Sequence, residues 1–164
     1  MDQTIVSDVR AFLKKNFVAV LGTSYLNLPF ASSIYYTIDD KLNFYFTTKT
    51  NTDKYLNLRT NRNVALVVSD RQKNVSVQVR GHATVLKDKR WRKRITEEIK
   101  AILHAQNEEW PIYKIKSLQS KNAPNDEIVY KVIPQHFVFT NLDDSSLPNS
   151  MSDEQHSIIS LLNE

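Results

Sequence analysis

The sequence predicts a mainly β protein in which six strands form a largely antiparallel β-barrel with flanking helices. Short runs rich in β-branched and aromatic residues recur along the chain, bounded by residues typical of turns. Most neighbouring runs are too close in sequence for a parallel crossover, so we expect hairpins and a sheet that closes on itself. The predicted strands lie at residues 17–24, 30–38, 42–48, 64–70, 74–86 and 127–142.

The first three predicted strands form a meander. The apolar run "FVAVLGTS" is followed by a turn at "NLP" and by the second run, "FASSIYYTI". The next residues, "DDK", predict a tight hairpin into the third strand. There Leu42, Phe44 and Phe46 alternate with polar or amphipathic positions, which indicates one face turned toward a core.

The later strands carry the clearest alternation. In residues 74–86 valines share one face and polar side chains the other, with Val75, Val77 and Val79 opposed to Ser76, Gln78 and Arg80. In residues 127–142, Pro134 lacks an N–H group, so we expect it at a sheet edge or a β-bulge.

Three helices are expected among the strands. Residues 4–15 and 89–105 show apolar residues at helical spacing. Residues 52–60 predict a shorter helix that Thr52 or Asp53 caps.

The C-terminal segment predicts a further, amphipathic helix. A capping box from Ser152 to Gln155 precedes a group of isoleucines and leucines. We expect this helix to pack on the barrel or on a second subunit. The chain is therefore divided into a barrel domain, residues 1–142, and a tail, residues 143–164.

Composition limits the possible functions. The chain has no cysteine, which excludes disulfides, iron–sulfur clusters and thiol catalysis. It shows neither an apolar run of roughly 20 residues that could span a bilayer nor a secretory signal, so a cytoplasmic location is the expectation. The four histidines show no metal-ligand spacing, so no metal site is predicted.

Charge points to anionic ligands. The net charge is +4, but the tail from residue 143 holds five acidic residues and no lysine or arginine, so the preceding chain carries +9. Such a basic body attracts phosphate cofactors or nucleic acid. Only two glycines occur, Gly22 and Gly81, and this excludes every Gly-rich phosphate loop.

A group of hydroxyls and one lysine follows the third strand. Thr47 and Thr48 end this strand, Thr52 opens the following helix, and Lys54 lies in its first turn. A helix N-terminus offers unpaired N–H groups and partial positive charge, so this arrangement suits a phosphate. The alternative is a solvated, threonine-rich loop whose lysine extends into water.

Four segments in order resemble a known family, the pyridoxamine 5'-phosphate oxidase-like FMN-binding split barrels. They are "FVAVLGTS…LPFASSIYY", "LNFYFTTKTNTDKYLNLRTNRNVALVV", "VSVQVRGHATVL" and "YKVIPQHFVF". The resemblance implies a six-stranded antiparallel split β-barrel that binds FMN. It also implies a homodimer with the flavin sites at the subunit interface.

The resemblance assigns roles residue by residue. Lys54 matches the lysine that contacts the FMN phosphate, and Thr47 and Thr48 match residues that cradle the phosphate and ribityl chain. The remaining matches are Ser32, Ser33, Ile34 and Tyr35 along the flavin ring and ribityl chain, Thr52 and Asp53 near the phosphate, and Ser76 or Gln78 for a family glutamine.

Two departures separate this chain from the true oxidases. Ser32 stands where the oxidases carry a phosphate-binding arginine, and the tail lacks the Arg-x-His pair that binds pyridoxine phosphate. We therefore expect a related flavoprotein that binds FMN weakly and does not make pyridoxal phosphate. Arg92 or Arg94 is a candidate to replace the missing arginine.

The leading functional prediction is an oxidoreductase that passes electrons between a small molecule and FMN; no catalytic residue is assigned. One alternative is a flavin- or haem-binding storage or sensor module without turnover, with His82 or His136 as haem ligand. A second is an enzyme that uses a deazaflavin. The run "KDKRWRKR" fits nucleic acid, but is more typical of a solvated helix start with Trp91 packed inward.

Overall fold

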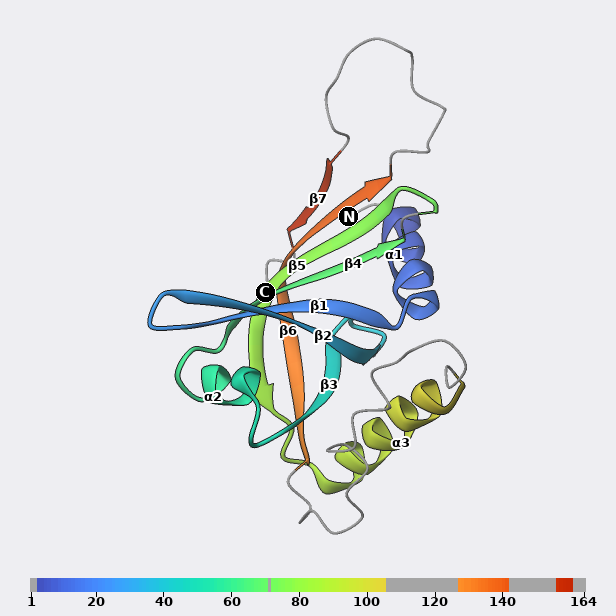
Figure 1. The fold of residues 1–164 in the computed structure, drawn as a ribbon. Coiled ribbons are helices and arrows are strands. Elements are labelled where there is room, and N and C mark those ends of the chain that lie inside the picture. The colour runs from blue at the N-terminus through green and yellow to red at the C-terminus, as the bar shows by residue number, and fades with distance from the viewer. Residues whose placement is uncertain (1–2, 71, 106–126, 142–155, 161–164) are drawn as a thin grey trace.

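The computed structural model describes residues 3–70, 72–105, 127–141 and 156–160. Six antiparallel strands close into a barrel in the order β3-β2-β1-β4-β5-β6, because β3 also pairs with β6 (Figure 1). This confirms the predicted fold class. The elements are α1 (Gln3–Lys15), β1 (Val18–Tyr25), β2 (Leu28–Ile38), β3 (Phe44–Lys49), α2 (Asp53–Thr60), β4 (Asn63–Asp70), β5 (Val75–Val85), α3 (Lys89–Ala105), β6 (Glu127–Asn141) and β7 (His156–Ser160).

The long strand β6 closes the barrel because other strands pair with both of its edges. One edge pairs with β5, and the other pairs first with β3, over Glu127–Val132, and then with β7, over His136–Thr140. The β5–β6 register shifts between Arg80 and Gly81, which leaves Gln135 without a partner on β5. Pro134 thus lies beside a β-bulge, as its missing N–H group predicts.

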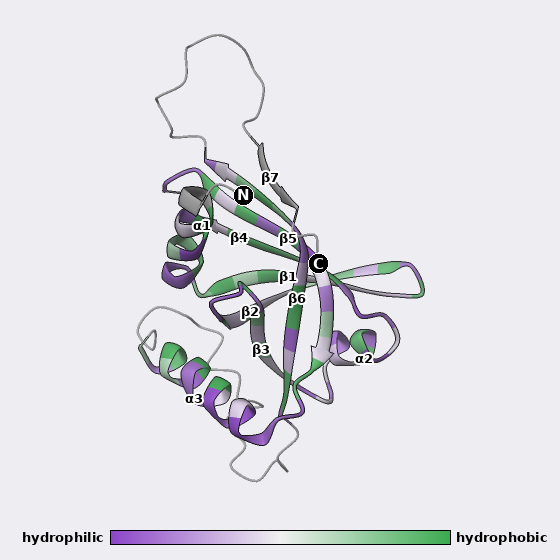
Figure 2. Ribbon diagram, turned by 180° about the vertical axis from the view of Figure 1, so that it is seen from behind, coloured by the Kyte–Doolittle hydropathy of each residue, from purple (hydrophilic) through white to green (hydrophobic). Residues whose placement is uncertain are grey.

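The barrel interior is the main core. The alternating side chains of the strands fill it, and the bands of hydrophobic and hydrophilic residues along β5 and β6 are visible in Figure 2. Helix α1 adds Val9 and Leu13 to the same cluster. The Tyr36 hydroxyl lies against the carbonyl oxygens of Leu13 and Asn16, which ties the end of α1 to the barrel.

Helix α3 covers part of the barrel exterior. Its Ile95 and Ile99 pack on Tyr45 and Val129, which face outward from β3 and β6. Trp91 meets the Tyr45 ring edge-on, with centroids 6.1 Å apart. The tryptophan therefore packs inward while the basic side chains around it remain largely exposed.

Two segments differ from the sequence-based expectations. Strand β3 begins at Phe44, because Leu42 is buried in the preceding turn with a positive φ of 59°. The predicted C-terminal helix is wrong where it can be compared, since His156–Ser160 form the strand β7. The reason is tertiary: where β3 leaves β6, an open strand edge remains, and β7 pairs with it. The capping box at 152–155 and the segment 106–126 lie outside the described residues.

No helix within the described ranges is long and apolar enough to cross a membrane.

Candidate functional site

The barrel is split between β2 and β3. These strands pair only at Tyr36 with Phe46, Thr37 with Tyr45 and Ile38 with Phe44. Beyond Tyr36, β2 continues beside β1 alone for eight residues, while β3 turns away toward α2. Within the part of the chain that the structure describes, this edge of β2 therefore has no strand partner over Leu28–Tyr35.

Helix α2 begins beside the split and is held there by its cap. Of the two predicted candidates, Thr52 and Asp53, it is Thr52 that forms the N-cap, and its hydroxyl oxygen accepts a bond from the Tyr55 N–H group at 3.4 Å. The same hydroxyl donates to the Lys49 carbonyl oxygen at 2.9 Å. Because its one proton is then used, the 2.8 Å contact with Thr48 requires Thr48 to be the donor.

These hydrogen bonds limit the number of hydroxyl donors that the threonines can offer to an anion. Neither Thr48 nor Thr52 has a free hydroxyl proton in this arrangement. The backbone donors at this helix terminus are the N–H groups of Asp53 and Lys54, which occupy the first two helical positions and have no acceptor within the helix. Both belong to the N-terminal turn, where the helix dipole favours negative charge.

Lys54 adds a charge that is only partly hydrated. Its side chain is half-buried, and this desolvation lowers the pKa of the ammonium, while the charge of Asp53 partly offsets the shift. Neither of the two ion pairs seen among the described residues involves Lys54. An anion bound beside it would therefore compensate a charge that the fold leaves poorly solvated.

The two threonines that end β3 face in opposite directions. Thr48 is buried toward the barrel interior, whereas Thr47 alternates with it and lies on the outer side with Tyr45. Thr47 follows the last β2–β3 pair on one strand and Tyr35 follows it on the other, so these two residues flank the start of the split.

The predicted site residues on β2 differ in how accessible their side chains are to a ligand. Ile34 is buried in the core, so its side chain is not available to a ligand. Ser33 is exposed on the outer face, while Ser32 is half-buried and alternates to the inner side. Asp53 is exposed at the start of α2. The structure thus places Ser32, Ser33 and Tyr35 along one side of the split and Thr47, Thr48, Thr52, Asp53 and Lys54 along the other, whereas the Ile34 side chain lies in the core.

The structure does not bring Ser76 and Gln78 to the split within one chain. Both lie on β5. Cross-strand pairing connects Gln78 to β2 through a continuous row of residues, Gln78–Val67–Val20–Ser33. Three strand spacings of roughly 4.8 Å separate the ends of this row by about 14 Å. Val20 and Val67, in its middle, remain 47% and 39% exposed on the barrel exterior.

The other basic and histidine candidates lie elsewhere. Arg94 is on α3, where it pairs with Glu98 at 2.8 Å and stacks on the Trp91 ring at 5.2 Å, so its guanidinium is already engaged. Arg92 is half-buried on the same helix, and His82 and His136 lie on β5 and β6. Within the described ranges, no group of three or more histidine or acidic side chains could hold a metal ion.

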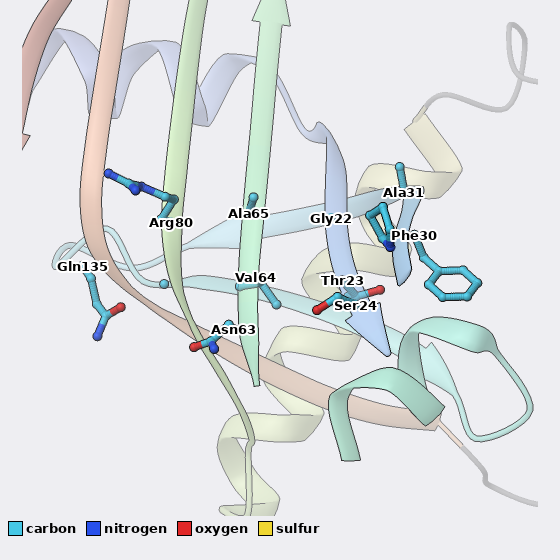
Figure 3. A pocket seen from close by; sticks show the side chains of 12 residues that line it. Gly22, Thr23, Ser24, Phe30, Ala31, Asn63, Val64, Ala65, Arg80 and Gln135 are labelled. Atoms are coloured by element: carbon cyan, nitrogen blue, oxygen red, sulfur yellow. The ribbon is translucent and has the colours of Figure 1, made fainter. Parts of the chain in front are cut away.

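Sequence reasoning missed an open pocket of about 710 Å³ on the barrel exterior. Figure 3 shows Gly22 and Ala65 between Arg80 and Gln135 on one side and Phe30 on the other. An unexplained glycine in the middle of a predicted strand was the signal that could have pointed to it. The lining residues are Gly22, Thr23, Ser24, Pro29, Phe30, Ala31, Asn63, Val64, Ala65, Arg80, Gly81 and Gln135.

These features define a split β-barrel with a candidate anion site at the first turn of α2. The model of the pyridoxamine 5'-phosphate oxidase family matches residues 5–139. The chain therefore belongs to this family.

Solved structures agree with the fold. General stress protein 26 from Bacillus anthracis has a TM-score of 0.63 at 14% identity, covering 96% of this chain and 98% of that chain. A related protein of the pyridoxinephosphate oxidase family from Clostridium acetobutylicum has a TM-score of 0.66 at 13% identity, with 98% and 97% covered. An FAD-binding protein from Mesorhizobium loti has a TM-score of 0.58 at 19% identity, with 80% and 88% covered. None of the curated proteins matches the sequence significantly.

Proposed function

We propose that this protein binds FMN at the split between β2 and β3 and passes electrons between a small molecule and the flavin. Membership of the pyridoxamine 5'-phosphate oxidase family supports a flavin, and so does the likeness to an FAD-binding protein. When bound, the flavin supplies the redox chemistry, and the protein supplies binding, orientation and hydrogen bonds.

The observation that carries this proposal is the environment of the Lys54 side chain. A half-buried ammonium with a lowered pKa lies in the first turn of a helix, where the dipole alone would disfavour it. A phosphate would pair with this charge and accept bonds from the Asp53 and Lys54 N–H groups. Thr47 is the nearby hydroxyl for which the structure shows no competing bond within the described chain.

We further propose that the working unit is a homodimer. Gln78 lies about 14 Å from Ser33 by strand spacing, and Ser76 lies two residues further along β5, so one chain alone does not complete the predicted set. A second copy packed on the uncovered exterior of β1, β4 and β5 would supply these side chains. The exposed Val20 and Val67 on that face favour such an interface.

The binding proposal is tested by titrating the full chain with FMN and following the quenching of flavin fluorescence. We expect saturation in the micromolar range and at least tenfold weaker binding by Lys54→Gln. Lys41→Gln, which removes an exposed turn lysine, is the matched control and should bind as the unaltered protein does. Absence of binding at high micromolar FMN would contradict the proposal.

Electron transfer is tested separately. The FMN-loaded protein is reduced with dithionite under nitrogen and then offered oxygen, quinones and other small acceptors. Acceleration of reoxidation by one acceptor class supports an oxidoreductase. Reoxidation at the rate of free flavin with every acceptor would instead indicate a storage or sensor module.

A further inference from the structure

The hairpin of β1 and β2 extends beyond the barrel as an arm. Among the described strands, β4 is the other partner of β1 and pairs with it only over Val20–Gly22. The pairing of β1 with β2 continues past this point to Tyr25 and Leu28. Residues 23–30 therefore form a two-stranded ribbon that projects from the body of the molecule (Figure 1, Figure 2). We call these eight residues the arm.

The arm carries apolar side chains in solvent and no charge. Leu26 and Leu28 are 78% and 61% exposed, and Tyr25 and Phe30 are also exposed. No acidic or basic residue occurs anywhere in residues 16–38, so nothing charged helps to solvate this hairpin. A group of exposed apolar side chains marks a surface that contacts another molecule.

The turn at the tip of the arm is built with an unfavourable residue. Leu26 and Asn27 form a two-residue turn, and both have a positive φ, of 47° and 63°. Asparagine adopts this conformation readily, whereas leucine adopts it at a cost. Because the Leu26 side chain is exposed, burial within the described chain does not offset that cost. A contact outside this chain would explain a leucine at position 26.

The strand register separates this apolar surface from the proposed dimer face. Val20 points to the barrel exterior, and Leu21 and Thr23 alternate with the exterior positions and are buried. Tyr25 belongs to the same set as Leu21 and Thr23, and Leu28 lies directly opposite Tyr25. A second copy packed on the exterior of β1, β4 and β5 would therefore leave Tyr25 and Leu28 in contact with solvent.

The shape of the arm limits what can cover it. Small-molecule sites are concave, whereas a projecting ribbon is convex. A standard protein interface takes about 20–30 residues from each partner, many more than the arm contains. Pro29 on its outer edge has no N–H group and disfavours the addition of a further strand. A lipid bilayer differs from these partners because it accepts a projecting apolar tip without needing a complementary shape.

Basic side chains lie beside the base of the arm. The Asn61 amide donates to the Ser24 hydroxyl at 2.7 Å and so ties the end of α2 to the arm. Arg59 and Arg62, on either side of Asn61 in sequence, are both exposed. Residues 54–69 contain no acidic residue. An apolar tip with cations at its base is complementary to a membrane surface that carries anionic lipids.

We infer that the arm docks this protein on membranes that contain anionic lipids. Leu26 and Leu28 enter the boundary between the headgroups and the acyl chains, while Arg59 and Arg62 contact the lipid phosphates. So few apolar side chains give weak and reversible binding, which the cations strengthen. This inference goes beyond the proposed function and does not depend on FMN, since the arm and Lys54 share no residue.

The test is flotation of the full chain with phosphatidylcholine vesicles, prepared with and without phosphatidylglycerol. Leu26→Asn removes the apolar tip and suits the positive φ, and Leu28→Thr keeps a residue that strands favour. Val85→Thr, at an exposed valine on β5, is the matched control for both.

The contribution of charge is tested by the double variant Arg59→Gln with Arg62→Gln. Its matched control is Lys14→Gln with Lys15→Gln, which removes two exposed lysines from the end of α1. Circular dichroism and urea unfolding verify that each variant is folded.

We expect the unaltered protein to float with the anionic vesicles. Leu26→Asn and Leu28→Thr should each lower the bound fraction at least fivefold. Leu26→Asn should at the same time unfold at a higher urea concentration, because it relieves the turn. The arginine variant should bind anionic vesicles at least fivefold less and no better than neutral ones, and both controls should bind as the unaltered protein does.

Three results would overturn the inference. The first is the absence of flotation at millimolar anionic lipid. The second is flotation that neither Leu26→Asn nor Leu28→Thr reduces, which would indicate attraction of the basic body alone. The third is dissociation of a dimer by Leu26→Asn in sedimentation without vesicles, which would show that a second copy covers the arm.

Discussion

The side-chain hydroxyls of Thr48 and Thr52 lie 2.8 Å apart, and this contact joins the end of β3 to the cap of α2. Thr52 also holds the Lys49 carbonyl oxygen and the Tyr55 N–H group. One threonine therefore fixes the position of the helix terminus that carries Lys54. The stability of this corner and the geometry of the candidate phosphate site depend on the same side chain.

Replacement of Thr52 tests this dependence. Thr52→Ala removes the N-cap, which costs about 1 kcal/mol, and leaves the buried Thr48 hydroxyl without an acceptor, which adds about 1–3 kcal/mol. We expect a lower free energy of unfolding in urea and weaker FMN binding. Thr52→Ser keeps the hydroxyl and should restore most of both quantities. Equal stability of the alanine and serine variants would show that the cap contributes nothing.

The lowered pKa of Lys54 makes FMN affinity depend on pH. A phosphate bound beside the ammonium favours its charged form, so the Lys54 pKa rises on binding. Above the lowered pKa of the free protein, binding then takes up a proton, and affinity falls as the pH rises through that pKa. Titrations from about pH 7.5 upward avoid the phosphate group's own ionisation.

Calorimetry in buffers of different ionisation enthalpy measures the proton uptake directly. Lys54→Arg is the control, because a guanidinium stays charged throughout the range and the affinity should then be flat with pH. A wild-type affinity that is equally flat would place the phosphate away from Lys54.

The barrel was predictable because its signals are local. Alternation of valines with polar residues defines β5, and the hydroxyl of Thr52 at the start of a short helix defines the cap of α2. Strand β7 was not predictable, because its pairing depends on the edge that β6 leaves open after it parts from β3. Local propensity carries no information about such an edge.

The corner around α2 and the open pocket differ in the same way. The residues around α2 are close in sequence, so their pattern could be recognised before the fold was known. The open pocket is lined in part by Ala31, Gly22 and Ala65, which come from three strands and lie together only through the sheet register. Each is an ordinary small residue in sequence, and only their alignment leaves room for the pocket.

The two glycines should respond in opposite ways to the same substitution. Gly22→Ala should leave the free energy of unfolding unchanged or raise it by up to about 1 kcal/mol, because the added Cβ makes only ordinary contacts and the unfolded chain loses entropy. Gly81→Ala should lower it by about 1–3 kcal/mol or more, because the Cβ overlaps the Ile133 carbonyl group. Urea unfolding of the two variants measures both effects. A similar cost at both positions would contradict this reading of the bulge.

Asp39 should make the β2–β3 turn sensitive to acid. Its carboxylate accepts bonds from the Lys41 and Asn43 N–H groups, the Asn43 amide and the Tyr45 hydroxyl. Burial tends to raise the Asp39 pKa, but these bonds outweigh it and hold the pKa below its ordinary value. The resulting stabilisation is present above the unfolded-state pKa and is lost as the pH falls through the lowered folded-state pKa.

Asp39→Asn therefore should lower stability at neutral pH and flatten its decline between about pH 5 and pH 2. Asp40→Asn, at the exposed neighbouring position, is the matched control and should keep the wild-type slope. Thermal unfolding at several pH values gives both curves. Parallel curves for Asp39→Asn and the wild type would mean that another carboxylate dominates the acid response.

The exposed side chains of Val20 on β1 and Val67 on β4 allow a direct test of the proposed dimer. Val67→Glu places a charge in the middle of the face that we propose a second copy covers, where an unpaired carboxylate is costly to bury. We expect sedimentation velocity to show a monomer in place of a dimer, and FMN affinity to fall because Ser76 and Gln78 of the second copy are lost with it. Val85→Glu is the matched control, since Val85 is 47% exposed on β5 but lies outside this row. If Val67→Glu remains dimeric, or if both variants dissociate alike, the subunits meet through another surface and Ser76 and Gln78 have no place in the flavin site.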